Sequence, residues 1–251
     1  RRLAAMDYVD LQVSLDGADA DTNDAIRGKR SYARAREAMD HLATASFDDF
    51  KINVVLTRAS IPQLDELQAL ANGYGARLRL TRLRPSGRGM DVWDDLRPTP
   101  AQQRELHAWL LEHPTTLTGD SLFHLNALGQ PLPGLSMCGA GRIVCLVDPV
   151  GDIYACPFLI HPDFKAGNVR EAGGFSEVWQ ASALFAEMRQ PTVAAGGCAS
   201  CTAFEVCKGG CIAAKVAAGS PLAGPDPECV HDPAPAAPRF TGQPLPVIAS
   251  L

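Results

Sequence analysis

Eight cysteines constrain this chain more than any other feature, because all of them lie between positions 138 and 229 of its 251 residues. Four of them fall within fourteen positions, in the run CASCTAFEVCKGGC from Cys198 to Cys211. A chain of this length buries a full core without cross-links, and its first residues, RRLAAMDYVDLQ, lack the apolar segment of a secretory signal. Both observations disfavour disulfide bonds and favour metal binding by the thiols.

The spacing of the cysteines leaves two kinds of metal site open. The numbers of residues between successive cysteines are six, ten, forty-one, two, five, three and seventeen. Close pairs such as Cys198 with Cys201 are typical of zinc sites, where each metal takes four ligands. Iron–sulfur clusters also take thiolates, four for each four-iron cluster, and eight cysteines make two full sets. Cys145, within the strand-like run GRIVCLVD, has the simpler interpretation of a buried small apolar residue.

The region before the cysteines, residues 1–113, alternates strand-like and helix-like patterns. The β-rich runs are YVDLQVSL (8–15), FKINVVLT (50–57) and RLRLTRLR (77–84), and each is followed by a helical segment. Three β–α units in succession predict a parallel sheet, either in a partial barrel or in an open doubly wound sheet. In both architectures ligands bind at the carboxyl ends of the strands.

Capping signals mark two of the expected helices. In SIPQLDELQALANGYG, Ser60 and Gln63 have the spacing of a capping box, and in TPAQQRELHAWLLEH the same holds for Thr99 and Gln102. A helical stretch also follows the first strand and is clearest at 32–45, whereas PSGRG, after the third strand, is expected to be a loop.

Polar side chains near the strand ends are candidate ligand contacts. Ser14 and Asp16 stand at alternate positions, so they point to the same face of their strand, and Arg82 and Arg84 do so on the third strand. Two arginines turned into an apolar barrel would need anions, whereas at a solvated strand end they need none. Asn53 alternates with apolar neighbours and is a candidate for the barrel interior.

Composition argues against two classes of partner. The formal net charge is -5 and no basic stripe is visible, so nucleic-acid binding is not expected. No run of about 18 apolar residues exists, so we expect no membrane span and a cytoplasmic protein. The Pro/Ala-rich end, residues 231–251, is expected to be an extended tail. His124 and His161 lie in loop-like segments and are expected at the surface.

The cysteine pattern resembles that of the SPASM domain of radical S-adenosylmethionine enzymes that mature peptides. The two-five-three-seventeen spacing from Cys198 to Cys229 fits throughout, as do Gly151 and Cys156 upstream. LQVSLDG and TNDAIRG resemble barrel segments of the same superfamily. TRLRPSGRG, TGDSLFHLNALG, CGAGRIVCLVDPVGDIYACPF and GPDPEC resemble the mycofactocin branch of the family, and the resemblance covers residues 6–230.

This resemblance implies an α/β fold, with the C-terminal half of a partial (β/α)6 radical-SAM barrel followed by a cysteine-rich SPASM domain with little regular structure. The implied segments are the partial barrel with its strands four to six (1–115), a linker (116–137), the SPASM domain (138–230) and the tail (231–251). The implied ligands form two interleaved sets. The first set, for auxiliary cluster I, is Cys138, Cys145, Cys156 and Cys211, and the second set, for auxiliary cluster II, is Cys198, Cys201, Cys207 and Cys229.

The implied cofactors are a 4Fe-4S cluster on each set and, in the full-length protein, S-adenosylmethionine with a third 4Fe-4S cluster. The residues that the resemblance brings to S-adenosylmethionine are Ser14, Asp16, Arg27, Asn53, Arg82 and Arg84. Their simpler interpretations are a strand-ending Asp-Gly turn and solvated arginines.

One departure from the family pattern concerns the radical chemistry itself. The family holds its S-adenosylmethionine cluster with Cys-x-x-x-Cys-x-x-Cys, and this chain has no cysteine before Cys138. At roughly 30 residues for each β–α unit, about 100 residues with that loop would precede the chain. The chain is interpreted as a fragment, with a degenerate homologue as the alternative, and in either case we expect that it does not cleave S-adenosylmethionine alone.

The activity implied by the resemblance is that of an oxidoreductase or lyase acting on a ribosomal precursor peptide. The C-terminal tyrosine is oxidatively decarboxylated and then joined through a carbon–carbon bond to the preceding valine, while the auxiliary clusters carry electrons. The implied partners are the precursor peptide, a small peptide-binding chaperone and an external electron donor. The alternatives are a non-enzymatic two-cluster electron-transfer or binding module and a zinc-stabilised interaction protein.

Overall fold

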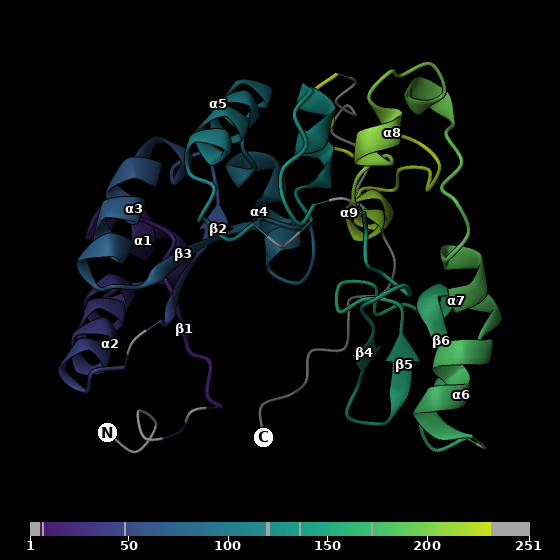
Figure 1. Ribbon diagram of the computed structural model, residues 1–251, viewed down its shortest axis with the longest axis horizontal. Coiled ribbons are helices and arrows are strands. Elements are labelled where there is room, and N and C mark those ends of the chain that lie inside the picture. The colour runs from purple at the N-terminus through teal and green to yellow at the C-terminus, as the bar shows by residue number, and fades with distance from the viewer. Residues whose placement is uncertain are drawn as a thin grey trace.

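The computed structural model describes residues 6, 8–47, 49–118, 121–135, 137–171 and 173–231. Its strands fall into two separate sheets of three (Figure 1), one before and one within the cysteine-rich region. The chain is thus a mixed α/β protein, as expected. In the part of the chain described, no helix is long and apolar enough to cross a membrane. The expectation for the tail concerns residues outside the described ones, except for His231.

The first sheet is parallel, in the order β1-β2-β3. Its strands are β1 (Gln12–Ser14), β2 (Lys51–Leu56) and β3 (Arg77–Arg82). A parallel bridge between Arg79 and Leu117 extends the sheet beyond β3. The prediction of a parallel sheet is confirmed, although β1 is shorter than the run at 8–15, because only its last part pairs with β2.

Five helices accompany this sheet. They are α1 (Ala20–Arg27), α2 (Ser31–Thr44), α3 (Leu64–Gly73), α4 (Gly89–Leu96) and α5 (Pro100–Glu112), with a 3-10 turn, η2 (Ile61–Gln63), before α3. In Figure 1, α1, α2 and α3 lie together on the outer side of the sheet. The remaining face of the sheet is turned away from these helices, as expected for a piece of a barrel wall.

The two faces of the sheet differ in polarity. Apolar side chains of β2 and β3 pack against Met39 and Leu67 of the helices in one core. They are Ile52, Val54, Leu56, Leu78 and Leu80, each at most 1% exposed. The opposite face carries Asn53 and Thr81, which the parallel register places on neighbouring strands. The polar positions at the strand ends are therefore available to the interior of the partial barrel.

The two capping predictions have different outcomes. At α5, Thr99 accepts from the backbone N–H of Gln102 and the Gln102 side chain returns to Thr99, so that capping box is confirmed. At Ser60 the prediction is wrong, because the chain turns there through η2 and Ser60 has no cap bond to it. The Ser60 hydroxyl instead accepts from the Thr57 N–H at 2.8 Å and closes the turn after β2.

The second sheet is antiparallel, in the order β4-β5-β6. Its strands are β4 (Leu146–Val147), β5 (Asp152–Tyr154) and β6 (Lys165–Asn168). The other elements here are short: η3 (Phe123–Leu128), η4 (Pro162–Phe164), α6 (Gly174–Ala181), α7 (Ala183–Met188), η5 (Gly196–Cys198), α8 (Phe204–Cys207) and α9 (Ile212–Ala217). This confirms a cysteine-rich part with little regular structure, in which loops carry most of the thiols.

Candidate iron–sulfur sites

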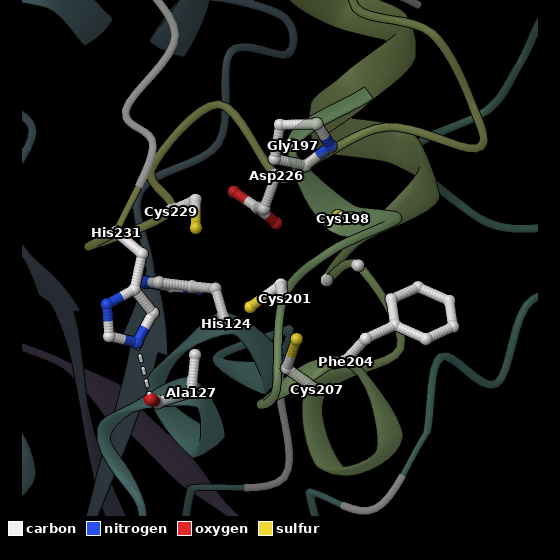
Figure 2. A pocket seen from close by; sticks show the side chains of 13 residues that line it. His124, Ala127, Gly197, Cys198, Cys201, Phe204, Cys207, Asp226, Cys229 and His231 are labelled. Atoms are coloured by element: carbon white, nitrogen blue, oxygen red, sulfur yellow. Dashed lines mark hydrogen bonds between the residues drawn. The ribbon is translucent and has the colours of Figure 1, made fainter. Parts of the chain in front are cut away.

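The four thiols of the second set line a single cavity (Figure 2). Cys198 and Cys207 end η5 and α8, and both are buried. Cys201 lies between these elements, and Cys229 arrives from beyond α9. The N–H of Cys229 donates to the carbonyl of Asp226 at 2.8 Å, which fixes the loop that brings it back. The structure therefore brings together the four residues that the resemblance assigns to one cluster.

This arrangement fits a four-iron cluster chemically. Such a cluster takes one thiolate for each iron, so its ligands surround a cavity and do not meet at one point. Within the described residues, no three His, Cys, Asp or Glu side chains converge closely enough to hold a single metal ion. The cavity is otherwise lined largely by apolar atoms, including the Phe204 ring. A dry apolar wall of this kind is one of the features that set the potential of a cluster.

A sharp reversal of the backbone separates Cys207 from Cys211. Lys208, Gly209 and Gly210 follow α8 with φ values of 50°, 74° and 81°, all in the left-handed region. Three such residues in a row turn the chain between two adjacent thiols, and glycine meets this requirement at no steric cost. The reversal explains how neighbouring cysteines of one short motif come to face different places.

Cys211 meets Cys138 across the fold. Cys211 precedes α9, and its backbone N–H donates to Oδ2 of Asp226 at 2.8 Å. A hydrogen bond with Cys211, assisted by the backbone N–H groups of Ile212 and Ala140, lowers the pKa of the Cys138 thiol to about 6. The same bond and burial raise the pKa of Cys211 well above its usual value. These two members of the first set therefore lie close enough to shift each other's pKa in opposite directions.

Cys156 and Cys145 differ in their electrostatic interaction with Cys138 and Cys211. Burial raises the pKa of Cys156, and the nearby Cys138 adds to the shift while Arg84 opposes it. Cys156 is thus within electrostatic range of Cys138. Burial alone raises the pKa of Cys145, with no contribution from another cysteine. Three members of the first set therefore influence one another electrostatically, whereas Cys145 shares only the apolar core with them.

The apolar packing also separates the two sets. Cys211 belongs to the main core, and the other three cysteines of the first set, Cys138, Cys145 and Cys156, pack against it. Cys207 instead belongs to a small separate cluster with Ala127 and Val230. The four cysteines of the first set thus share one apolar core, and Cys207 of the second set lies outside it.

Burial acts on the second set as well. It raises the pKa of Cys198 and of Cys207, in each case as the largest cause. Thiols must lose their protons to bind metal, so loading such a site releases protons and couples metal binding to folding.

A buried group of charges joins the end of β3 to the loop before Cys229. The Arg82 guanidinium is 4% exposed, donates to both oxygens of Asp226, at 2.9 and 2.6 Å, and pairs with Glu228. Burial opposes ionisation of Asp226, but Arg82 outweighs it and holds the pKa of that carboxyl below its usual range. Sequence reasoning missed both carboxylates, although they stand one and three positions before Cys229 in GPDPEC.

His124 contradicts the expectation of a surface histidine. It is 3% exposed and lines the cavity of the second set (Figure 2). Burial, together with the nearby Arg82, lowers the pKa of its imidazole to about 3. Nothing in its local sequence distinguishes it from a loop histidine, because its neighbours come from distant segments: residues 197–231 on one side, and β2, β3 and α5 on the other.

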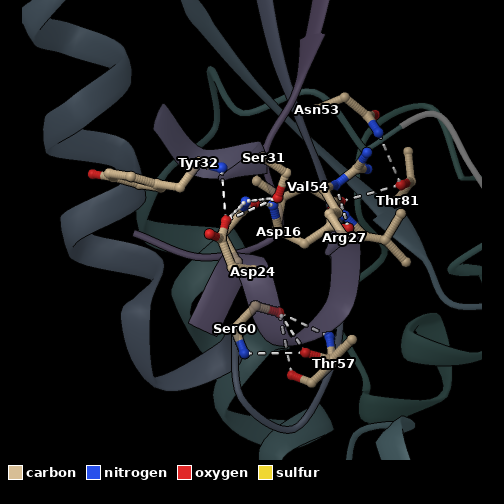
Figure 3. Close-up of polar contacts among 12 residues, drawn as sticks. Asp16, Asp24, Arg27, Ser31, Tyr32, Asn53, Val54, Thr57, Ser60 and Thr81 are labelled. Atoms are coloured by element: carbon tan, nitrogen blue, oxygen red, sulfur yellow. Dashed lines mark hydrogen bonds and ion pairs between the residues drawn. The ribbon is translucent and has the colours of Figure 1, made fainter. Parts of the chain in front are cut away.

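The residues expected to contact S-adenosylmethionine divide into two groups. Near the end of β1, Asp16 is 2% exposed, pairs with Arg27 at 2.6 Å and accepts from the Val55 N–H at 2.8 Å (Figure 3). Asn53 lies on the same polar face, donates to Thr81 at 3.4 Å, and has a buried carbonyl oxygen without a hydrogen-bond partner. Ser14 pairs with Asn53 in the β1–β2 register. An amide with spare acceptor capacity beside a paired carboxylate is suited to a polar ligand.

The two arginines of the second group lie toward the cysteines. Arg82 is already neutralised by Asp226 and Glu228. The Arg84 guanidinium lies 3.7 Å from the centre of the Phe158 ring, and burial lowers its pKa, although Cys211, Cys156 and Cys138 oppose the shift. Both were expected at a cofactor or peptide carboxylate; that role stays a prediction, and the contacts described connect them to the cysteine-rich part.

Comparisons with known proteins agree with this geometry. The family model SPASM, an iron-sulfur cluster-binding domain, matches residues 138–209. The chain is 61% identical over 233 residues to the mycofactocin maturase MftC of Mycolicibacterium smegmatis and 60% identical to MftC of Mycobacterium tuberculosis. Each alignment covers 92% of this chain and 59% of the relative. The chain therefore spans about three-fifths of the length of these curated relatives.

A more distant relative and a solved structure are also similar to most of this chain. The AdoMet-dependent heme synthase of Methanosarcina barkeri is 29% identical over 92% of this chain and 70% of its own length. Among solved structures, a histidine-tagged form of anSMEcpe with bound AdoMet superposes with a TM-score of 0.61 at 15% identity, over 87% of this chain and 60% of that chain. This second likeness shows the fold alone: a protein solved with bound AdoMet folds in the same way over most of this chain.

Proposed function

The chain belongs to the SPASM-domain radical S-adenosylmethionine maturases, and on that premise we propose that it carries the auxiliary-cluster part of a mycofactocin maturase. The observation that supports this most is the 61% identity to a mycofactocin maturase over 92% of the chain. The cavity lined by all four thiols of the second set supports it independently.

In this proposal each cysteine set holds one 4Fe-4S cluster. Cys138, Cys145, Cys156 and Cys211 would hold auxiliary cluster I, and Cys198, Cys201, Cys207 and Cys229 would hold auxiliary cluster II. Such clusters supply one-electron transfer when bound. The chain's own contribution is to bury the thiols, to supply backbone N–H groups near Cys138 and Cys211, and to anchor both sets on Asp226.

The polar face of the partial barrel is the proposed contact for S-adenosylmethionine. Asp16, held by Arg27 and by the Val55 N–H, offers a fixed carboxylate, and Asn53 offers an unused carbonyl oxygen. Ser14 stands beside Asn53 in the sheet. These groups can orient a ribose or an amino acid moiety through hydrogen bonds without movement, because their positions are set by strands.

The proposed reaction is the oxidative decarboxylation of a C-terminal tyrosine in a precursor peptide, followed by a carbon–carbon bond to the preceding valine. In that second step the valine would lose one hydrogen atom, and the carbon–carbon double bond formed from the tyrosine would gain one hydrogen atom as it accepts the new bond. In the first step the tyrosine loses carbon dioxide, one hydrogen atom and one electron, and a carbon–carbon double bond forms. The hydrogen atom goes to the radical generated from S-adenosylmethionine, and the electron needs an acceptor within the protein. Two buried cluster sites on one short domain suit that task.

The proposed partners follow from the same premise. They are the precursor peptide, a small peptide-binding chaperone and an external electron donor. Among the relatives, a PqqA peptide cyclase of Rhodopseudomonas palustris, 26% identical over 92% of this chain, also acts on a peptide according to its name.

Iron and sulfide analysis of the anaerobically purified chain tests the cluster assignment. We expect about eight irons and eight sulfides per chain, four of each for each set of thiolates. Zinc without sulfide would refute it. A longer protein that contains this chain, incubated with S-adenosylmethionine, reductant and the peptide, should then yield a product lighter by carbon dioxide and two hydrogens. An intact peptide and no 5′-deoxyadenosine would leave only an electron-transfer module.

A further inference from the structure

Lys215 on α9 is a buried cation in the midst of the cysteines. Its side chain is among the largest that are fully buried, with 1% of the residue exposed. Its Nζ donates to the carbonyl of Leu222 at 2.8 Å. Among the described residues, no carboxylate lies within salt-bridge distance of it. Burying an ammonium with a single carbonyl partner is costly unless other negative charge stands nearby.

The ammonium of Lys215 lies close to Gly209, in the backbone reversal between Cys207 and Cys211. A methyl group added at Gly209 would come within 2.9 Å of Lys215 Nζ, closer than real contacts allow. Gly209 thus leaves the space in which the ammonium lies. Because Cys207 belongs to the second set and Cys211 to the first, this position is at the junction of the two proposed cluster sites.

The electrostatic interactions of Lys215 reach both sets. Burial lowers its pKa, while Asp226, Cys198, Cys138 and Cys211 act in the opposite direction. Cys198 is a member of the second set, and the other two thiols belong to the first. Asp226 is itself bound to Arg82, so its charge is shared. With clusters bound, the thiolates of Cys198, Cys138 and Cys211 would supply further negative charge around the ammonium.

We propose that Lys215 is a positioning residue whose fixed positive charge raises the reduction potentials of both auxiliary clusters together. This inference rests on the proposed function, in which both sets hold clusters. A cluster that accepts one electron from a reductant becomes more negative by one charge. A buried cation nearby stabilises the reduced state more than the oxidised state, and the low-dielectric surroundings strengthen this effect. One cation placed between the sites favours reduction of both.

The test is an anaerobic redox titration followed by EPR of the purified chain and three variants. Lys215→Met removes the charge with little change of volume, and Lys215→Gln removes it while keeping an N–H donor for Leu222. Lys208→Met is the matched control: it removes a lysine from the same motif, but that side chain is 37% exposed and paired with Glu205 at 2.5 Å. Iron and sulfide are counted in every sample.

In both Lys215 variants we expect the ratio of reduced to oxidised cluster, at a fixed ambient potential, to fall at least tenfold for both clusters. For a one-electron couple this equals a shift of about 59 mV. Lys208→Met should change the ratio less than about threefold. The proposal is overturned if fully loaded Lys215 variants titrate like the control, if only one cluster shifts, or if both variants lose iron, which would mean a structural role. A wild-type chain without eight irons would instead refute the proposed function.

Discussion

The two cysteine sets are built in different ways. The second set comes from residues 198–229 and lines one cavity, so local turns and a single returning loop are enough to assemble it. The first set spans residues 138–211 and depends on contacts between segments far apart in the chain, with Cys138 reaching Cys211 across the fold. The second set depends on contacts that are close in sequence, so it can form early in folding. The first set requires the surrounding core to be in place.

The same comparison shows what connects the sets. Asp226 accepts from the N–H of Cys211, a member of the first set, and its carbonyl accepts from the N–H of Cys229, a member of the second. Arg82 ties this residue to the end of β3. The two sites differ in their construction but share one anchor, so changes at a ligand and changes at the anchor should have different consequences.

The largest expected effect comes from removing one ligand of each set. Cys211→Ala should halve the iron content, from about eight to about four per chain, and abolish the signal of one cluster. Cys229→Ala should also halve it but abolish the other signal. Iron analysis and EPR of the reduced chain measure both.

Cys145→Ala completes this experiment, because burial alone shifts the pKa of Cys145, with no contribution from another cysteine. If it is a ligand, its variant should match Cys211→Ala. A chain that keeps eight irons without Cys145 would remove it from the set. If Cys211→Ala and Cys229→Ala lost the same cluster, the interleaved assignment would be wrong.

The next effect concerns the shared anchor. Asp226→Asn should lower the free energy of unfolding by up to about 3–5 kcal/mol, because it removes one of the two carboxylates that neutralise the buried Arg82 charge. Unlike a ligand variant, Asp226→Asn should weaken the binding of both clusters to the chain. Urea unfolding under anaerobic conditions, followed by tryptophan fluorescence and iron release, measures this. Asp163→Asn, at a carboxyl that is 80% exposed, is the control. Equal unfolding curves for Asp226→Asn and Asp163→Asn would show that Asp226 does not anchor the two cysteine sets.

These sites show how far the sequence could be interpreted. The parallel sheet and the α5 capping box follow from local patterns, and both were foreseen. The division of the cysteines into two ligand sets came from the family resemblance and stays a prediction. The burial of His124 and the charges around Arg82 were not, because they depend on residues 226–228 folding back onto the end of β3. The helix α4 was missed since it begins at Gly89, the last residue of the expected PSGRG loop.

The two glycines of KGGC also show the limit of what the sequence alone indicates. From the sequence, small residues beside a cysteine indicate close approach of the backbone to a cluster. In the structure, Gly209 also leaves room for Lys215, six positions later, and Gly210 leaves room for Asp226, sixteen positions later. The spacing of the cysteines indicates candidate ligands, whereas the charged residues around them are recognised only once the fold is known.

A smaller effect should separate the two sets in the metal-free chain. Cys138 has a pKa of about 6, whereas burial raises the pKa of Cys198 and Cys207 above the usual value. At pH 6 Cys138 therefore carries a larger fraction of thiolate than Cys198 and Cys207, and this outweighs the lower nucleophilicity of a more acidic thiol. Alkylation with iodoacetamide and peptide mass spectrometry should find Cys138 modified first.

The source of this reactivity can be checked in the same assay. The hydrogen bond with Cys211 is the largest cause of the low pKa of Cys138. Cys211→Ala should therefore return Cys138 to the rate of the other thiols, whereas Cys229→Ala should leave it fast. Equal rates for all thiols in the wild-type chain would contradict the contact.

The smallest expected effect tests whether the partial barrel supports the cysteine sites. Thr99→Ala removes the cap of α5 and should cost about 1 kcal/mol of stability. In the first turns of that helix, Gln103 contacts Glu228 at 3.3 Å and Arg104 donates to the Val230 carbonyl at 3.2 Å, on either side of Cys229. A loss of this size is small beside the free energy of metal binding, so iron content should stay at the wild-type level. Thr44→Ala, at the exposed end of α2, is the control for threonine loss. If Thr99→Ala released iron from the second cluster alone, the cap of α5 would prove necessary for holding Cys229, and the second set would be less self-contained than its cavity indicates.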